Sequence, residues 1–320
     1  MDSVDRISPL TILLDEVFYK STIQDTRKSY FFATKGERSW IFLSDYYFGD
    51  EKPNKVMTFS AMPSCPYLLE MKAAIKALAP KEIKHTRTVN PDFVALVNLL
   101  PLINVVFVFE NGKHFIWDTL SEAKGAILDH VEVLKAYVDY WRTTEPVSVS
   151  RLNRIEKNLH ILERLLESGK KLRIVAAMFL ISLLGGYVGS LICRETDLTH
   201  LTWFSDRDST NEIGKNLIRD LFQITLIDVT KKNINFSFTT SNSDSDEWYE
   251  EMTRIPDYLT GAVAGFDFKQ NRAIDQKTAQ MLGLHFNGNI KNTFVYRFKV
   301  DDNRIRLQRM LINYGPKTAQ

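Results

Sequence analysis

The sequence predicts a mixed α/β protein in which a sheet is flanked by helices and carries a helical block in the middle of the chain. Short aliphatic and β-branched runs near both ends have the length and composition of core strands. Residues 118–194 instead show long helical patterns. At 320 residues, 44% hydrophobic and 25% charged, the chain can bury a substantial core.

Residues 1–117 are expected to hold the first part of the sheet. Leu10–Leu14 is an aliphatic run that ends in the acidic pair Asp15-Glu16, and we predict that it forms the first core strand. Two more strands, 30–34 and 39–46, are expected to form a hairpin with its turn at Gly36. The other elements expected in this part are a strand, two helices and a strand: 55–60, 67–78, a helix that starts at Pro91 with Asn90 as its cap, and 103–109.

Residues 118–194 are predicted to form the helical block, and 195–320 to complete the sheet and end in a hairpin. Helical periodicity marks three helices in the block: 118–142, 149–166 and 174–193. Strand and helix patterns alternate after it: strand 201–205, helix 212–225, strand 234–239, helix 247–266 after the acids 244–246, and strands 294–300 and 305–312 around Asp302-Asn303.

The third helix of the block raises the question of a membrane. Ile174–Cys193 is a run of roughly twenty residues without charge, which meets the length criterion for a membrane span. Its glycines and serines soften a helix, and the α/β pattern resumes directly after it, so we favour a buried core helix over a membrane or oligomer-interface helix. The leucine-rich stripe from Leu152 to Leu166 favours a homo-oligomer formed through the block.

Composition excludes several kinds of site and makes the cytoplasm the expected location. Two distant cysteines, Cys65 and Cys193, and six scattered histidines provide neither a disulfide framework nor the ligand spacing of a zinc site. The polar residues 1–9 are unlike a signal peptide. Since the formal net charge is only +2, any surface for nucleic acid must be a local patch.

Four acidic residues are predicted to lie where a strand ends or a helix begins: Asp15, Glu82, Asp206 and Asp257. Aligned strand ends can bring such carboxylates to one edge of a sheet, and hard divalent cations prefer charged oxygen ligands. We therefore expect Mg²⁺ or Mn²⁺ at this edge, where it would activate water for phosphodiester cleavage. The alternative for each residue is a solvated acid of the kind common at strand ends.

Two of these acids have informative neighbours. Asp257 lies on a helical face whose other residues are small: Gly261, Ala264 and Gly265. Such a face lets another backbone or a ligand come close. If the segment around Glu82 is an extended strand, Glu82 and Lys84 share a face and His85 points the other way, so Glu82 and Lys84 are the expected functional pair.

These stretches resemble a family of bacterial and phage proteins in the ribonuclease H-like, integrase-type superfamily. In that family the opening strand typically reads Asp-Glu-Ser-Gly and a late helix reads Ala-Asp-Leu-Ile-Ala-Gly. The similar stretches here are Leu14-Asp15-Glu16-Val17 and Ile255-Pro256-Asp257-Tyr258-Leu259-Thr260-Gly261-Ala262. The chain departs from the pattern at Val17-Phe18, which replaces the small pair, and at Pro256.

The resemblance implies a ribonuclease H-like mixed sheet and a metal-dependent nuclease acting on nucleic acid or a nucleotide. The implied metal ligands are Asp15 and Asp206, which would bridge the metals, with Glu82 and Asp257. Lys84 would contact phosphate, helped by Arg87 and Arg207, and Glu70 is an alternative to Glu82. The competing hypothesis is a non-catalytic interaction protein of the same fold that docks partners through its helical block.

Overall fold

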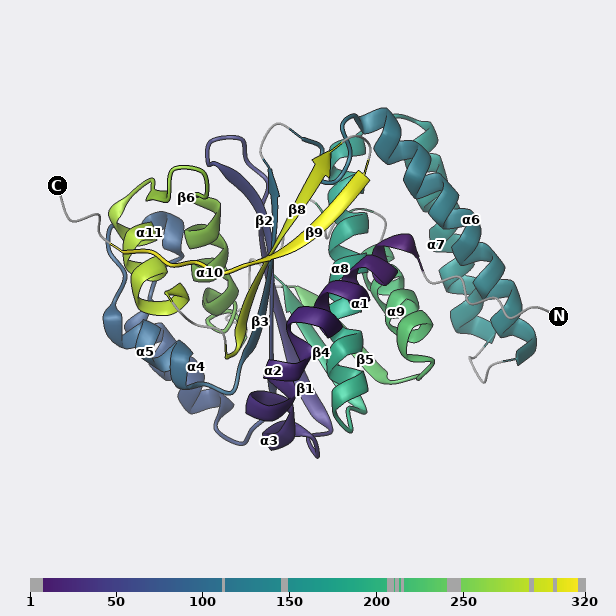
Figure 1. Cartoon of the computed structure of the whole chain (residues 1–320). Coiled ribbons are helices and arrows are strands. Elements are labelled where there is room, and N and C mark those ends of the chain that lie inside the picture. Colours follow the sequence, from purple (N-terminus) through teal and green to yellow (C-terminus); the bar gives the residue numbers. More distant parts are fainter. Residues whose placement is uncertain are drawn as a thin grey trace. The chain divides into compact units, whose positions relative to one another are not determined.

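Figure 1 shows the computed structural model of the chain. It describes these residues: 8–110, 113–144, 149–205, 210, 213, 216–240, 249–287, 291–301 and 304–315. The chain divides into two compact units. The helical unit comprises Met1–Leu14, Lys113–Leu191 and Arg207–Asn233, and the sheet unit comprises Asp15–Gly112, Ile192–Asp206 and Ile234–Gln320.

The sheet unit is built on a mixed seven-stranded sheet in the order β5-β4-β1-β2-β3-β8-β9. Its strands have the following bounds: β1 (Ser39–Tyr47), β2 (Asn54–Pro63), β3 (Ile103–Glu110), β4 (His200–Ser205), β5 (Asn235–Thr240), β8 (Thr293–Asp301) and β9 (Arg304–Met310). Strands β1, β2 and β3 form an antiparallel meander, while β4 and β5 extend the sheet parallel to β1. Strand β8 is parallel to β3, so the carboxyl ends of β1, β3, β4, β5 and β8 share one edge.

Helices cover both faces of the central strands, whose side chains alternate between two cores. Ile41 and Leu43 of β1 belong to a core cluster with Leu259 and other residues of α10 (Arg254–Ala264). Figure 1 shows α10 on one side of the sheet together with α4 (Leu68–Leu78), α5 (Pro91–Leu99) and α11 (Gln276–Met281). On the other face, Phe18 of α1 (Pro9–Ser21) stacks on Tyr296 of β8 with ring centroids 4.4 Å apart.

Short elements complete the sheet unit. Between α1 and β1 the chain forms α2 (Ile23–Thr26), the π-helical turn Arg27–Phe31 and α3 (Phe32–Thr34). A two-stranded hairpin, β6 (Phe266–Asp267) with β7 (Arg272–Ala273), follows α10, and the π-helical turn Leu282–Phe286 follows α11.

The helical unit contains α6 (Leu120–Thr144), α7 (Val149–Glu167), most of α8 (Leu172–Glu195) and α9 (Leu217–Thr230). The predicted leucine-rich stripe of α7 is buried: Leu152, Ile155, Leu159, Leu162 and Leu166. Because this stripe is already covered, it is not a free surface for a partner, and the homo-oligomer stays a prediction.

Helix α8 is the one helix in the described part of the chain that is long and apolar enough to span a membrane, and 94% of its apolar window is buried. A Cβ on Gly186 would lie 2.7 Å from the carbonyl oxygen of Phe222, so glycine permits the close approach of α8 and α9. The core-helix interpretation predicts both observations.

Two early strand predictions are wrong. Leu10–Leu14 belongs to helix α1, in which Thr11, Leu14 and Phe18 are buried with helical spacing. Pro9 suits the first position of a helix, where no backbone donor is needed. Residues 30–34 are helical as well, so the chain around Gly36 is not the turn of a hairpin, and β1 starts the sheet.

The other predicted elements agree with the structure within a few residues at most ends. Asn90 caps α5 as predicted, because its side chain accepts a hydrogen bond from the Asp92 backbone N–H. The helix predicted to begin at residue 212 begins at Leu217, and the helix predicted to begin at residue 247 begins at Arg254. The predicted acids 244–246 and the hairpin turn Asp302-Asn303 lie outside the described residues.

Candidate functional site at the carboxyl end of β1

Asp15 lies on helix α1 rather than at the end of a strand. Its carboxylate accepts two hydrogen bonds from the guanidinium of Arg194: Nη1 to Oδ2 at 3.1 Å and Nη2 to Oδ1 at 2.8 Å. This bidentate ion pair joins α1 to the end of α8, and both side chains are about three-quarters buried (27% and 22% exposed). The geometry that made Asp15 a candidate metal ligand is therefore absent.

Glu82 immediately precedes a 3₁₀ turn, Ile83–His85, that contains Lys84, so the extended-strand case considered for this segment does not apply. The Glu82 carboxylate forms ion pairs with Lys84 and with Arg254 of α10. Partial burial by itself would raise the pKa of Glu82, but these two cations hold it below the ordinary value. Arg87 on the following loop and the alternative ligand Glu70 on α4 are both exposed.

Asp257 lies near the start of α10 and holds the Ile83 turn in place. Its Oδ2 accepts a hydrogen bond from the backbone N–H of Ile83 at 2.7 Å. A Cβ on Gly261 would lie 2.4 Å from Cγ2 of Ile83, so the small helical face is occupied by this turn. The small face is therefore filled by the Ile83 side chain, and the hydrogen bond from the Ile83 backbone brings the Glu82 segment to Asp257.

Lys277 of α11 also binds the Ile83 turn. Its ammonium donates to the carbonyl oxygens of Ile83 at 2.8 Å and Thr86 at 3.2 Å. The Tyr258 hydroxyl adds a hydrogen bond to the Lys81 carbonyl at 3.0 Å. The turn is therefore held by side chains of both α10 and α11.

Asp206 lies outside the described residues, as does Arg207. The described part of β4 ends at Ser205, which is the register partner of Ser44 on β1. Ser44 immediately precedes an aspartate, Asp45, that the sequence analysis did not select.

Asp45 lies near the carboxyl end of β1, opposite Thr58 of β2. By alternation it shares a face with Leu43, which is the face that α10 covers. The Thr260 hydroxyl of α10 lies 2.8 Å from the Thr58 hydroxyl and 3.3 Å from the backbone carbonyl of Asp45. Thr260 is one helical turn beyond Asp257, so both aspartates belong to the same layer. The sequence signal that could have identified Asp45 is its position: it is an acid near the end of the aromatic run 39–47, which forms a strand.

Lys52, in the connection between β1 and β2, lies within electrostatic range of both aspartates. Partial burial lowers its pKa, and so does the neighbouring ammonium of Lys277, while Asp275, Asp257 and Asp45 oppose this effect. The Lys52 ammonium also lies 4.6 Å from the ring centroid of Tyr47.

Asp275 caps α11 by accepting a hydrogen bond from the Thr278 backbone N–H at 2.9 Å. It completes a group that we call the lysine–carboxylate site: Asp45, Lys52, Asp257, Asp275 and Lys277. All five belong to the sheet unit.

The donor set of this site can be compared with the needs of a metal ion. Within the described ranges, no three His, Cys, Asp or Glu residues are arranged to hold a metal by themselves. Mg²⁺, however, is often bound by one or two protein carboxylates, with water and substrate phosphate completing its shell. Asp45 and Asp257 therefore suit Mg²⁺ only together with a phosphate substrate or a further ligand.

Comparison of the chain with protein-family models, with curated protein sequences and with solved structures finds no match. The geometry of the lysine–carboxylate site is accordingly the basis for a functional assignment.

Proposed function

We propose that this protein is a divalent-metal-dependent nuclease or nuclease-like hydrolase whose reaction centre is the lysine–carboxylate site. The observation that carries the proposal is the packing of α10 against the end of β1, where Thr260, one turn from Asp257, contacts the Asp45 backbone and Thr58, with Lys52 within electrostatic range of both aspartates. This packing lies beside the carboxyl end of β1, and ligands of open α/β sheets bind outside the carboxyl ends of strands.

The strand order supports a ribonuclease H-like arrangement. The order β3-β2-β1-β4-β5, with an antiparallel meander followed by two strands parallel to the first, is the order of a ribonuclease H-like sheet. In this assignment β1 is the family's opening strand. Asp45 then takes the role that the sequence resemblance gave to Asp15.

Asp45 and Asp257 are the proposed ligands of Mg²⁺ or Mn²⁺, and Asp206 is the proposed third ligand. The ion would polarise the phosphodiester and lower the pKa of a bound water. Phe204, two residues before Asp206, belongs to the core cluster on the face that α10 covers. Glu82 is engaged by Arg254 and Lys84, so its proposed role is to hold the start of α10 in position.

Lys52 is the proposed contact for the substrate phosphate, in place of Lys84, whose ammonium pairs with Glu82. A lysine ammonium neutralises a phosphate as a point charge. The substrate class is a nucleic acid or a nucleotide phosphodiester.

The test compares two aspartate variants of equal size and charge. Asp45→Asn is expected to lower metal-dependent cleavage of an oligonucleotide at least about 100-fold, which corresponds to about 2.7 kcal/mol in the activation free energy. Asp15→Asn is the matched control and is expected to cleave at the wild-type rate, since Asp15 pairs with Arg194 away from this cluster.

Binding of Mn²⁺ measured by electron paramagnetic resonance gives a readout that does not depend on turnover. The wild type and Asp15→Asn are expected to bind Mn²⁺, and Asp45→Asn to bind it at least about tenfold more weakly, a difference of about 1.4 kcal/mol. Unchanged cleavage and unchanged Mn²⁺ binding in Asp45→Asn would disprove the proposal.

A further inference from the structure

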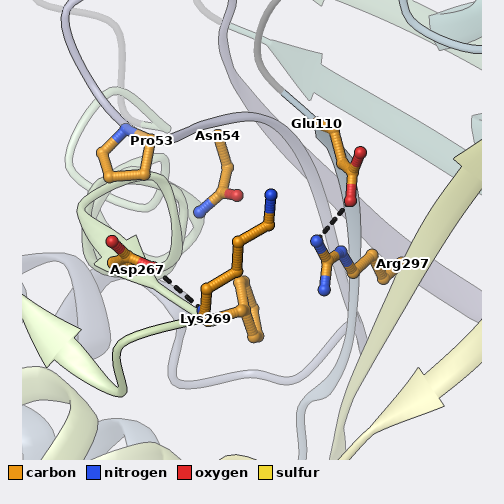
Figure 2. Close-up of a pocket in the computed structure, with 7 residues that line it drawn as sticks. Pro53, Asn54, Glu110, Asp267, Lys269 and Arg297 are labelled. Atoms are coloured by element: carbon orange, nitrogen blue, oxygen red, sulfur yellow. Dashed lines mark hydrogen bonds and ion pairs between the residues drawn. The ribbon is translucent and has the colours of Figure 1, made fainter.

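A pocket separate from the lysine–carboxylate site lies in the sheet unit, and Figure 2 shows the side chains that line it. Its cavity volume is about 200 Å³, and we call it the Arg297 pocket. It is lined by the start of β2, the end of β3, the middle of β8 and the β6–β7 hairpin: Pro53, Asn54, Glu110, Asp267, Phe268, Lys269 and Arg297.

The strand register puts this pocket at the functional edge of the sheet. Asn54 is the register partner of Glu110, the last residue of β3, and Arg297 is the partner of Val108. Val108 belongs to the core cluster that α10 covers, and Glu110 shares its face by alternation. The chain also links the two sites directly, because Lys52 is two residues before Asn54.

Arg297 is a buried cation with one unsatisfied hydrogen-bond donor, its Nε–H. The residue is only 9% exposed, and its Nη2 donates to Oε1 of Glu110. Its guanidinium lies 5.6 Å from the ring centroid of Phe268. The Nε–H is buried and has no acceptor among the residues that the structure describes. A buried guanidinium normally has most of its five N–H donors satisfied, so this one lacks an acceptor.

Lys269 adds a second cation to the pocket. Figure 2 shows its side chain extending between Asn54 and Arg297. The turn that carries it is held by Asp267, whose Oδ1 accepts hydrogen bonds from the backbone N–H groups of Lys269 at 2.9 Å and Gln270 at 3.0 Å. The Lys269 ammonium makes no ion pair within the described ranges, whereas the Asp267 carboxylate is used by the turn.

Asn54 makes the opposite wall rigid. Its Nδ2 donates to the carbonyl oxygens of Val263 at 3.0 Å and Phe266 at 2.7 Å. The pocket therefore has fixed polar walls, which reduces the entropy lost when a ligand binds.

The charged side chains of the Arg297 pocket indicate the chemical class of its ligand. A guanidinium with an unsatisfied N–H beside an ammonium suits a phosphate. Glu110 and Asp267 bring the formal charge of the four ionic side chains to zero, so a lone phosphate ion should bind only weakly. A phosphate that is part of a longer chain held elsewhere gains effective concentration and can occupy such a pocket.

We propose that the Arg297 pocket binds a backbone phosphate of the nucleic-acid strand that the lysine–carboxylate site cleaves. The proposal rests on the proposed function for the identity of the strand, and the pocket residues account for binding without taking part in the chemistry. It also accounts for strand binding by a chain of almost zero net charge, because one built pocket supplies local cations.

The experiment measures fluorescence anisotropy of a short fluorescein-labelled oligonucleotide in EDTA, so that no metal-dependent cleavage occurs. Lys269→Ala is expected to weaken binding about 5–10-fold and to reduce the slope of log K against log salt by about 1. Lys20→Ala is the control, since Lys20 is an exposed lysine on α1 paired with Glu16, and its affinity should equal that of the wild type. Arg297→Lys keeps the charge but loses the planar fork, and is also expected to bind more weakly, with circular dichroism as a check on folding.

The outcomes separate this inference from the proposed function. Wild-type affinity in Lys269→Ala would overturn the pocket assignment even if Asp45→Asn abolished cleavage. Weaker binding in Lys269→Ala together with normal cleavage by Asp45→Asn would support the pocket and overturn the cleavage site. An oligonucleotide that does not bind the wild type would overturn the pocket assignment outright.

Discussion

The helical unit and the sheet unit surround buried charge differently. The carboxylate of Asp220 in the helical unit is paired with a cation, whereas the lysine–carboxylate site of the sheet unit brings like charges near one another. Asp220 is 1% exposed and accepts three hydrogen bonds: from Arg154 Nη2 at 2.8 Å, from Arg154 Nε at 3.2 Å and from Asn158 Nδ2 at 2.6 Å. Lys52 instead has the like charge of Lys277 beside it and three carboxylates around it, and its pKa is lowered.

This difference is the one expected between a structural charge and a charge in the proposed reaction centre. The two oxygens of the Asp220 carboxylate accept hydrogen bonds from one arginine and one amide side chain. These hydrogen bonds stabilise a particular packing of α7 against α9. Like charges held close together and a shifted pKa cost stability and are typical of sites that bind or react. The comparison therefore favours the lysine–carboxylate site as the functional centre.

The two regions should differ most in how much unfolding free energy is lost when the charge of one aspartate is removed from each. Asp220→Asn should lower the free energy of unfolding by about 2–3 kcal/mol, less than for a fully buried pair, because Arg154 is 39% exposed and can reach water. Asp45→Asn should change it by less than about 1 kcal/mol. Urea unfolding of both variants measures this, and equal losses would erase the distinction between the two regions.

A glycine exchange tests whether the Ile83 turn positions Asp257. Gly261→Ala should lower the free energy of unfolding by about 1–3 kcal/mol, since the new Cβ would overlap Ile83, and should also slow cleavage. The control is Gly125→Ala on the exposed side of α6, where no atom lies within 4 Å and alanine should add about 0.5–1 kcal/mol. Equal thermal stability of the two variants would contradict the tight packing.

The pH dependence of stability reports on Lys52. Its folded pKa is lower than the unfolded value of about 10.4, so between these two values the unfolded state binds more protons and wild-type stability gains from rising pH. Lys52→Met lacks this contribution. The difference in unfolding free energy between wild type and Lys52→Met should therefore shift in favour of the wild type as the pH rises from about 8 to about 10.5. Parallel curves for the two proteins would contradict the desolvated position of Lys52.

The smallest effect is expected at the ion pair between α1 and α8. Asp15→Asn should cost about 0.5–1 kcal/mol of unfolding free energy, because Asp15 and Arg194 are both partly exposed. A loss of about 2 kcal/mol or more would place Asp15 in the class of Asp220.

The sequence by itself determined the mixed α/β class and most of the helices and strands. The signals behind these predictions are local: the cap Asn90, the alternation of β3 and the helical stripe of α7 depend on residues a few positions apart. The face of α10 that carries small residues could also be predicted from the sequence, because Gly261 and Asp257 are one turn apart on the same helix.

Only the tertiary structure decided which aspartate lies near the end of the first strand. A run as short as Leu10–Leu14 suits a strand and a helical turn equally well, and long-range packing selects the helix. The partners that give Asp45 its position, Thr58 and Thr260, and the partners that give Arg297 its pocket, Glu110 and Phe268, are distant in the sequence. No local pattern carries such contacts, because they form only when the sheet brings β1, β2, β3 and β8 together under α10.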